Sequence, residues 1–279
     1  MTTLETVVQF LQYGTVTPKS FGVYHLVCLT LTILITVLMV WKFRDADAKT
    51  VRRILLTAWI VMVVLEIYKQ VVFSYRENIY VPGHMIWSYY WFAFPFQFCS
   101  SPLYILPFVI WLKEGRFKDA FVAFTATFSV FGGLAVMLYP NDVFVKMLGI
   151  NVQTMIHHGL QIILGVFLAA RYRRRWSWKL FLPGTIPFAA LSAVAIMLNE
   201  VMYGYITSRG IEGVAFNMFY ISPHYGCSLP LLSAIYPKVP YPVFLLVYLL
   251  GFAVVAAVIF AAELGVIRLA RRLSRGKGV

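Results

Sequence analysis

Long uninterrupted runs of apolar residues are the feature that most constrains how this chain can fold. Hydrophobic residues make up 61% of its 279 residues and charged residues only 13%. Several runs reach the roughly 20 residues that a helix needs to cross a bilayer, whereas the strands of a β-barrel would alternate over about ten. A water-soluble protein could not bury them all. We therefore predict an all-α membrane protein that forms a single domain over residues 1–279. Its seven expected transmembrane helices cover residues 21–41, 54–75, 94–112, 119–139, 152–171, 180–206 and 241–264.

Basic residues gather in every second connection between these predicted helices. The basic segments are residues 42–53, 113–118, 171–179 and 268–277. Because loops rich in lysine and arginine stay on the cytoplasmic side, we expect the N-terminus outside and the C-terminus in the cytoplasm. The same distribution accounts for the net charge of +13 without a nucleic-acid partner.

Two segments outside these helices also have an expected structure. Residues Thr2 to Thr17 are predicted to form a short helix at the membrane interface. The long connection of residues 207–240 is apolar and contains Asn217, His224 and Cys227. We expect it to fold back over the bundle rather than to extend into water.

Polar residues occur at a similar depth in four of the predicted helices. Counting 1.5 Å per residue from the outer helix ends places most of them about 8 to 13 Å below the membrane edge. Ionisable groups inside a membrane are costly and commonly functional. The sequence therefore predicts bent helices around a lipid-accessible cavity in the outer half of the bundle. The residues concerned are Glu66, Lys69, Cys99, His157, Asn199 and Glu200.

Cys99 and His157 form the candidate chemical pair, because a nearby imidazole can convert a thiol into the nucleophilic thiolate. The alternative is that Cys99 is a small packed side chain, which we expect for Cys28. His158 points about 100° away from His157 on the same helix, so either histidine could face the cavity. No metal-site spacing is present and three cysteines make no disulfide framework, so we expect neither a metal nor another cofactor.

Glu66 and Lys69 lie three residues apart, which places them on one helix face. They are predicted to neutralise each other as an ion pair. The alternative is that Lys69 attracts a phosphate or carboxylate. Pro95 fits the first turn of the third predicted helix. Downstream of Cys99 in the same helix, Pro102 and Pro107 should free the carbonyls of Phe98 and Leu103.

These motifs resemble those of the YwaF-like bacterial integral membrane proteins and their eukaryotic relatives, which include a cysteine-dependent phospholipid acyltransferase. The resemblance covers most of residues 20–265. It is carried by the run Leu65-Glu66-Ile67, the run FPFQFCSSPLYILPF around Cys99, His157, and FNMFYIS around Asn217. It implies a bacterial cytoplasmic membrane, Cys99 as the reactive cysteine, and His157 or His158 as its histidine.

Two positions depart from the pattern of this family. Gln97 stands where bacterial members often carry a histidine, which removes a candidate base. The family's Gly-Thr-Asn-Tyr-Met run before the last loop is also replaced here by the less compact sequence Ala-Phe-Asn-Met-Phe at residues 215–219.

The predicted function is a membrane-embedded acyltransferase acting on phospholipids or lysophospholipids. Cys99 would attack an acyl ester, His157 would take and return the proton, and Asn217 or Gln97 would stabilise the oxyanion. The competing prediction is a transporter or receptor that binds a lipid or small molecule without chemistry. The histidine pair also resembles that of ceramide synthases and elongases, which take acyl-CoA from the cytosol. The predicted substrate-binding residues are Glu66, Lys69, Gln97, His158, Asn199, Glu200, Asn217 and His224.

Overall fold

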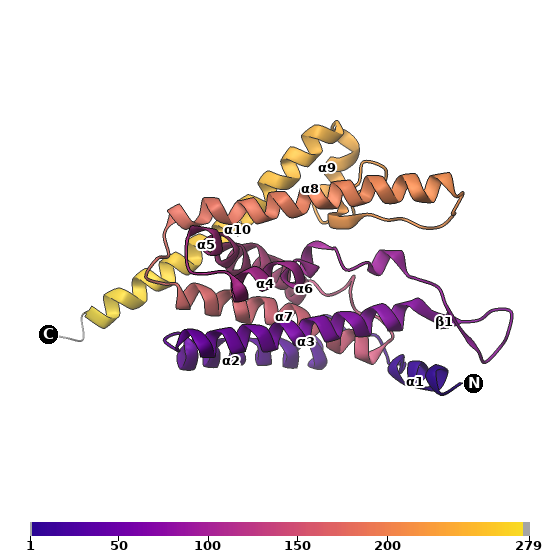
Figure 1. Ribbon diagram of the computed structural model, residues 1–279, viewed down its shortest axis with the longest axis horizontal. Helices are drawn as coiled ribbons and strands as arrows, with labels where there is room; N and C mark the ends of the chain where they lie inside the picture. Colours follow the sequence, from indigo (N-terminus) through magenta and orange to yellow (C-terminus); the bar gives the residue numbers. More distant parts are fainter. Residues whose placement is uncertain (1, 276–279) are drawn as a thin grey trace.

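The computed structural model describes residues 2–275. It shows a bundle of long helices whose axes are roughly aligned (Figure 1). Lys277, in the predicted basic tail, lies outside the described residues. Six helical stretches of the described chain are long and apolar enough to cross a membrane. The chain is thus a multi-pass integral membrane protein. The stretches are α2 (Val23–Phe43), α3 (Ala48–Ser74), Arg116–Leu138, α7 (Leu148–Arg171), α8 (Trp178–Ser208) and α10 (Tyr241–Arg275).

The third predicted helix, residues 94–112, is shorter than expected. Even with the preceding turn, the apolar stretch Phe98–Trp111 is below the length that crosses a bilayer. Six spanning helices are therefore found where seven were predicted, and a seventh crossing is not confirmed. This region comprises the 3-10 turns η1 (Trp91–Ala93) and η2 (Phe98–Ser100), followed by α4 (Pro102–Trp111).

Proline explains why α4 starts late. The residue before a proline is biased toward extended backbone, and Phe94, which precedes Pro95, has ψ of 134°. Pro102 instead occupies the first turn of α4, where its missing N–H costs no hydrogen bond. Cys99 consequently lies on a 3-10 turn before α4 rather than inside a regular helix.

The helices differ in how much of their surface the bundle covers. In α7 and in Arg116–Leu138, 72% of an apolar 18-residue stretch is buried inside the bundle. In α2 the corresponding share is only 11%. The Arg116–Leu138 stretch holds α5 (Arg116–Phe124), the π-helical turn η3 (Thr125–Ser129) and α6 (Val130–Leu138). These elements form the centre of the bundle, and the apolar face of α2 is left for lipid.

One end of the bundle carries a small extramembrane layer, here called the hairpin end. Strand β1 (Tyr75–Glu77) pairs antiparallel with β2 (Met85–Trp87), with Arg76 opposite Ile86. The predicted interfacial helix is present as α1 (Thr3–Leu11). It is shorter than residues 2–17 and begins with a capping box in which Thr2 and Glu5 bond each other's backbone.

The connection of residues 207–240 folds back onto the bundle, as predicted. Four apolar side chains at its start are buried, namely Phe216, Met218, Phe219 and Ile221. Its short helical elements are η4 (Met218–Tyr220), α9 (Leu232–Ile235) and η5 (Tyr236–Lys238).

The basic connections meet at the opposite end of the bundle, here called the basic end. Arg173 contacts Asp45 at 2.7 Å, and Arg175 contacts Asp119 at 2.8 Å. Arg271 of α10 also donates to the carbonyl of Arg173. The connections after α2 and α7 therefore lie together with the start of α5 and the end of α10. That this end faces the cytoplasm stays a prediction.

Candidate functional site

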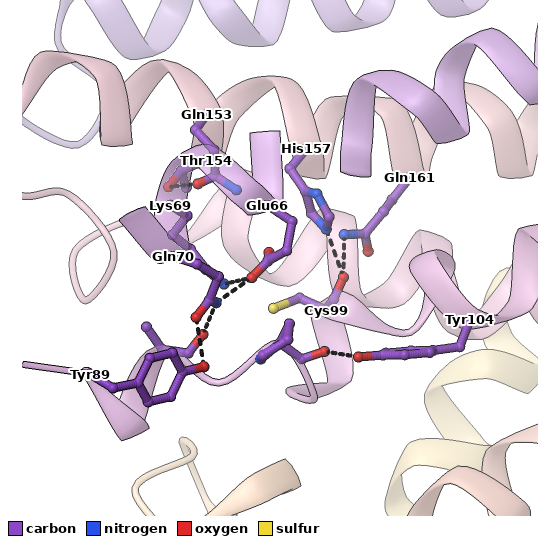
Figure 2. Close-up of polar contacts among 12 residues, drawn as sticks. Glu66, Lys69, Gln70, Tyr89, Cys99, Tyr104, Gln153, Thr154, His157 and Gln161 are labelled. Atoms are coloured by element: carbon purple, nitrogen blue, oxygen red, sulfur yellow. Dashed lines mark hydrogen bonds and ion pairs between the residues drawn. The ribbon is translucent and has the colours of Figure 1, made fainter. Parts of the chain in front are cut away.

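Cys99 is held through its backbone rather than through its thiol. Nε2 of His157 lies 3.0 Å from the Cys99 carbonyl oxygen, and Nε2 of Gln161 lies 2.9 Å from the same oxygen (Figure 2). His157 and Gln161 are four residues apart on α7 and so share one face. Since a carbonyl only accepts, Nε2 of His157 must carry the hydrogen, and Nδ1 is the ring atom with the lone pair.

We call the two contacts from His157 and Gln161 to the Cys99 carbonyl the double clamp. Several polar atoms around this clamp have no hydrogen-bond partner among residues 2–275. They are buried, and a buried polar atom without a partner costs free energy unless water or a ligand satisfies it. This part of the protein therefore has unused capacity to bind a polar molecule. The atoms are Nδ1 of His157, Nε2 of His158, Oε1 of Gln161 and Oγ of Ser101.

Glu66 forms the centre of a second polar group beside Cys99. Nζ of Lys69 lies 2.9 Å from Oε1 of Glu66, which is the ion pair expected from their spacing. Nε2 of Gln70 donates to the same oxygen at 2.6 Å and to the carbonyl of Ala93 at 2.6 Å. The hydroxyl of Tyr89 donates to Oε1 of Gln70 at 2.7 Å. The network therefore ties α3 to the segment that leads to Cys99.

The Cys99 thiol points toward the Glu66 group and away from His157 (Figure 2). Glu66 and Lys69 both lie close enough to the thiol to act on it electrostatically. Within the described residues, His157 makes its hydrogen bond to the Cys99 carbonyl and none to the sulfur. The direct contact between imidazole and thiol that the proposed pairing requires is therefore absent from this conformation.

Two glycines allow α6 and α7 to approach closely at this site. A Cβ atom on Gly133 would lie 2.7 Å from the carbonyl oxygen of His158, which is too close for any side chain. A Cβ atom on Gly132 would lie 3.0 Å from Oε1 of Gln161. The glycine pair thus fixes the position of the α7 face that holds Cys99.

The comparison with known proteins adds a family to this geometry. Residues 20–262 match the model of the TMEM164 family. The chain belongs to the TMEM164 family. No curated protein and no solved structure matches it. TMEM164 is a family of transmembrane proteins, and the finer resemblance to YwaF-like proteins stays a prediction.

In this TMEM164-family chain, His158 has a different role from His157. Its Nδ1 lies 2.7 Å from the carbonyl oxygen of Thr154, one turn earlier on α7, so its hydrogen bond stays within its own helix. Of the two adjacent histidines, His157 is therefore the one in contact with Cys99.

Three predicted site residues form a separate group that anchors the connection of residues 207–240. Gln97 donates to the carbonyl of Asn217 at 3.0 Å and accepts from the backbone of Phe219 at 3.0 Å. Asn199 exchanges two hydrogen bonds with the backbone of Met218. Asn217 bonds the backbones of Gly226 and Ser222 through its own amide. Their polar groups are all used by backbone, so they shape the segment next to Cys99.

Glu200 and His224 are apart from the Cys99 group. Nε2 of His224 lies 3.0 Å from Oε2 of Glu200, and the imidazole stacks on Tyr203 with ring centroids 3.5 Å apart. The Glu200 side chain is 49% exposed. The idea that all the predicted polar residues share one site therefore holds for Glu66, Lys69, Cys99 and His157, but not for Glu200 and His224.

The predicted cavity in the outer half is not confirmed. One open hollow of the described structure lies beside Lys146 and residues 14–17, and another lies at the basic end. Among residues 2–275 there is also no group of three or more histidine, cysteine or acidic residues that could hold a metal ion.

Four residues of interest in this TMEM164-family chain were missed by sequence reasoning. Gln161 could have been found because it follows His157 by one helical turn, and Gln70 because it follows Glu66 in the same way. Tyr89 belongs to the aromatic run of residues 87–92, and no spacing there indicates a contact with Gln70. Glu263 of α10 is an acidic residue inside a predicted span, and its carboxylate is buried beside the indole N–H of Trp176.

Proposed function

We propose that this protein is a cysteine-dependent acyltransferase that acts on phospholipids or lysophospholipids in a bacterial cytoplasmic membrane. The observation that carries the proposal is the double clamp on the Cys99 carbonyl, with the thiol directed at an ion pair. A cysteine that served only for packing would need neither feature.

The backbone around Cys99 supports this role. Irregular backbone at membrane depth is tolerated where it is buried in protein or lines a cavity. Here two α7 side chains and the prolines Pro95 and Pro102 hold a 3-10 turn in place. Fixing a nucleophile in one orientation lowers the entropic cost of its attack.

The geometry favours Glu66 over His157 as the group that accepts the thiol proton. The N–H of His157 is used by the Cys99 carbonyl, so its ring positions the turn that carries the thiol. Lys69 and Gln70 both contact Oε1 of Glu66, which leaves Oε2 available as an acceptor. We therefore assign Glu66 as the base and His157, with Gln161, as positioning residues.

The reaction then proceeds in two halves. The Cys99 proton passes to Glu66, and the thiolate sulfur attacks the carbonyl carbon of a phospholipid ester. The ester C–O bond breaks, and the leaving lysophospholipid oxygen takes the proton from Glu66. In the second half, the hydroxyl of another lysophospholipid gives its proton to Glu66 and attacks the thioester. The C–S bond of the thioester breaks, and the Cys99 thiolate takes the proton back from Glu66.

Lys69 is the best-placed group to stabilise the oxyanion formed in each half. Gln97 and Asn217, which the sequence suggested for this role, use their amide groups to bond backbone. An ammonium group has three donors, and the Glu66 contact uses one of them. The remaining donors of Lys69 can therefore meet a developing negative charge.

The deciding experiment compares the parent protein with Cys99→Ser in liposomes that contain a phospholipid donor and an isotope-labelled lysophospholipid. We expect acyl transfer to fall by roughly a thousandfold or more, because loss of a covalent nucleophile removes the intermediate. Cys28→Ser is the matched control and should retain the parent rate. Intact mass should also show an acyl adduct on the parent that hydroxylamine removes.

Two results would overturn the proposal. Equal transfer by Cys99→Ser and the parent would exclude Cys99 as the nucleophile. Lipid binding by the parent without any acyl transfer would favour the transporter or receptor function instead.

A further inference from the structure

A second candidate site lies at the basic end, in a cavity of about 200 Å³ between α3, α4, α5 and α7. Its deeper wall consists of aliphatic side chains, including the buried Val51, Leu55, Val109 and Ile110. Cys99 and the Glu66 group do not line this cavity. Whatever the cavity binds is therefore held by a different set of residues.

The mouth of this cavity carries an excess of positive charge. Arg52, Lys118 and Arg171 line it together with a single acid, Glu114. Glu114 is already occupied, since Lys118 contacts its Oε1 at 2.9 Å and the Tyr172 hydroxyl donates to it at 2.8 Å. Arg52 and Arg171 are thus the two guanidinium groups at the mouth that remain available.

Neither arginine has an ion-pair partner among residues 2–275, and the nearby carboxylates are engaged elsewhere. Asp45 pairs with Arg173 at 2.7 Å. Asp47 caps α3 by accepting hydrogen bonds from the backbone and the hydroxyl of Thr50. Two unpaired guanidinium groups over an apolar wall call for a ligand that is anionic at one end and apolar at the other.

We propose that this cavity binds the phosphate group of an anionic membrane phospholipid. Guanidinium groups form paired hydrogen bonds with phosphate oxygens, which suits Arg52 and Arg171. The first methylene groups of the acyl chains would lie along Val51, Leu55 and Val109. Basic pockets between membrane helices are a known way to recognise anionic headgroups. The cavity is smaller than a site that encloses a whole ligand, as expected when the chains continue into the bilayer.

The test measures lipid binding to the delipidated full-length protein in neutral detergent by native mass spectrometry. Phosphatidylglycerol is compared with phosphatidylcholine, and the parent with the double variant Arg52→Gln/Arg171→Gln. We expect the parent to prefer phosphatidylglycerol and the double variant to bind it at least about tenfold more weakly, because two charge-assisted contacts are lost. The matched control is Arg53→Gln/Arg174→Gln, which removes two exposed arginines close in sequence to Arg52 and Arg171 that do not line the cavity.

A second variant tests the cavity without changing any charge. Ala48 lies on the rim and is exposed, so Ala48→Phe should narrow the mouth and leave the fold intact. We expect it to weaken phosphatidylglycerol binding severalfold. Unchanged binding by Ala48→Phe would overturn the cavity site, even if the double variant failed to fold.

Two further outcomes would also overturn the proposal. Equal losses in the control and the cavity double variants would show general attraction to a basic surface. Competition by inorganic phosphate as effective as that by phosphatidylglycerol would show a free-phosphate site rather than a lipid site. Because binding is read without acyl transfer, these results are independent of the role of Cys99.

Discussion

Glu66 and Glu5 are two buried carboxylates, one in a membrane helix and one at the hairpin end. Glu66 lies in a membrane helix and links α3, through Gln70, to the segment before Cys99. Glu5 lies in α1 at the hairpin end and links that helix to the hairpin by accepting from the backbone of Met85 at 3.1 Å. Glu5 therefore joins distant parts of the chain directly, whereas Glu66 contacts Lys69 and Gln70 of its own helix and Gln70 makes the long-range contact.

The partners of the two acids differ although their side chains are similarly buried, with Glu66 9% and Glu5 11% exposed. Glu66 has a lysine at 2.9 Å, and both side chains are largely buried. Glu5 relies on backbone N–H groups and on His84 at 3.2 Å, whose side chain is 48% exposed. In the membrane region a full countercharge is needed because water cannot solvate the carboxylate. At the hairpin end, two backbone N–H groups and the His84 imidazole serve as the partners instead.

The largest effect is expected when the membrane pair is broken. Glu66→Gln should leave Lys69 as an unpaired buried charge and lower the free energy of unfolding by about 3 to 5 kcal/mol. It should also lower acyl transfer by roughly a hundredfold or more, since the proposed proton acceptor is lost. Thermal unfolding in detergent and the liposome transfer assay measure the two effects.

The double variant Glu66→Gln/Lys69→Gln separates stability from chemistry. Removing both charges should restore much of the lost stability, because no uncompensated charge remains. Acyl transfer should stay low. A double variant that transfers acyl chains at the parent rate would contradict the assignment of Glu66 as the base and leave the pair as a structural feature.

The next effect concerns whether His157 positions Cys99 or accepts its proton. His157→Gln keeps an N–H donor of the kind that Gln161 already directs at the same carbonyl. We expect it to retain acyl transfer within about tenfold of the parent, whereas His157→Ala should lose about a hundredfold, because only the alanine removes the donor. The pH dependence of Cys99 alkylation should be the same in His157→Gln as in the parent. Equal losses in both variants, with a shifted alkylation profile in His157→Gln, would instead identify His157 as the base.

The sequence predicted the charges of this site better than its backbone. The spacing of Glu66 and Lys69 predicted their ion pair, and the ion pair is present. Pro107 was expected to free the carbonyl of Leu103, and that carbonyl accepts a hydrogen bond from Trp59 at 2.9 Å. These are local rules, because helix geometry within a few residues decides them.

Contacts between distant segments could not be predicted in the same way. Pro95 was expected in the first turn of the third predicted helix and Pro102 inside it, whereas Pro102 occupies the first turn of α4 and so breaks no hydrogen bond within that helix. Gln97, which lies between them, bonds the backbone of residues 217 and 219. No local pattern indicates that contact. The late start of α4 and the turn that carries Cys99 therefore depend on packing that only the folded chain shows.

The smallest effect is expected at Glu5, and it sharpens the contrast with Glu66. Backbone hydrogen bonds from Thr2 and Met85 lower the pKa of the Glu5 carboxyl to about 2, from an ordinary value of 4.5. A lowered pKa means that the folded state binds the proton less readily than the unfolded chain does. The contribution of Glu5 to stability is therefore fully present above about pH 4.5. It is lost as the pH falls toward about 2.

Selective ¹⁵N-methionine labelling measures this directly, because the Met85 amide donates to Glu5. Its chemical shift should titrate with a midpoint near pH 2, and Met85→Leu identifies the signal. Glu5→Gln should abolish the titration while leaving acyl transfer and the membrane helices unchanged, since Glu5 lies outside the membrane helices and the glutamine carbonyl can still accept a backbone hydrogen bond. A midpoint near 4.5, the ordinary value, would show that the backbone contacts of Glu5 do not persist in solution. In that case α1 would not be tied to the hairpin through this carboxylate.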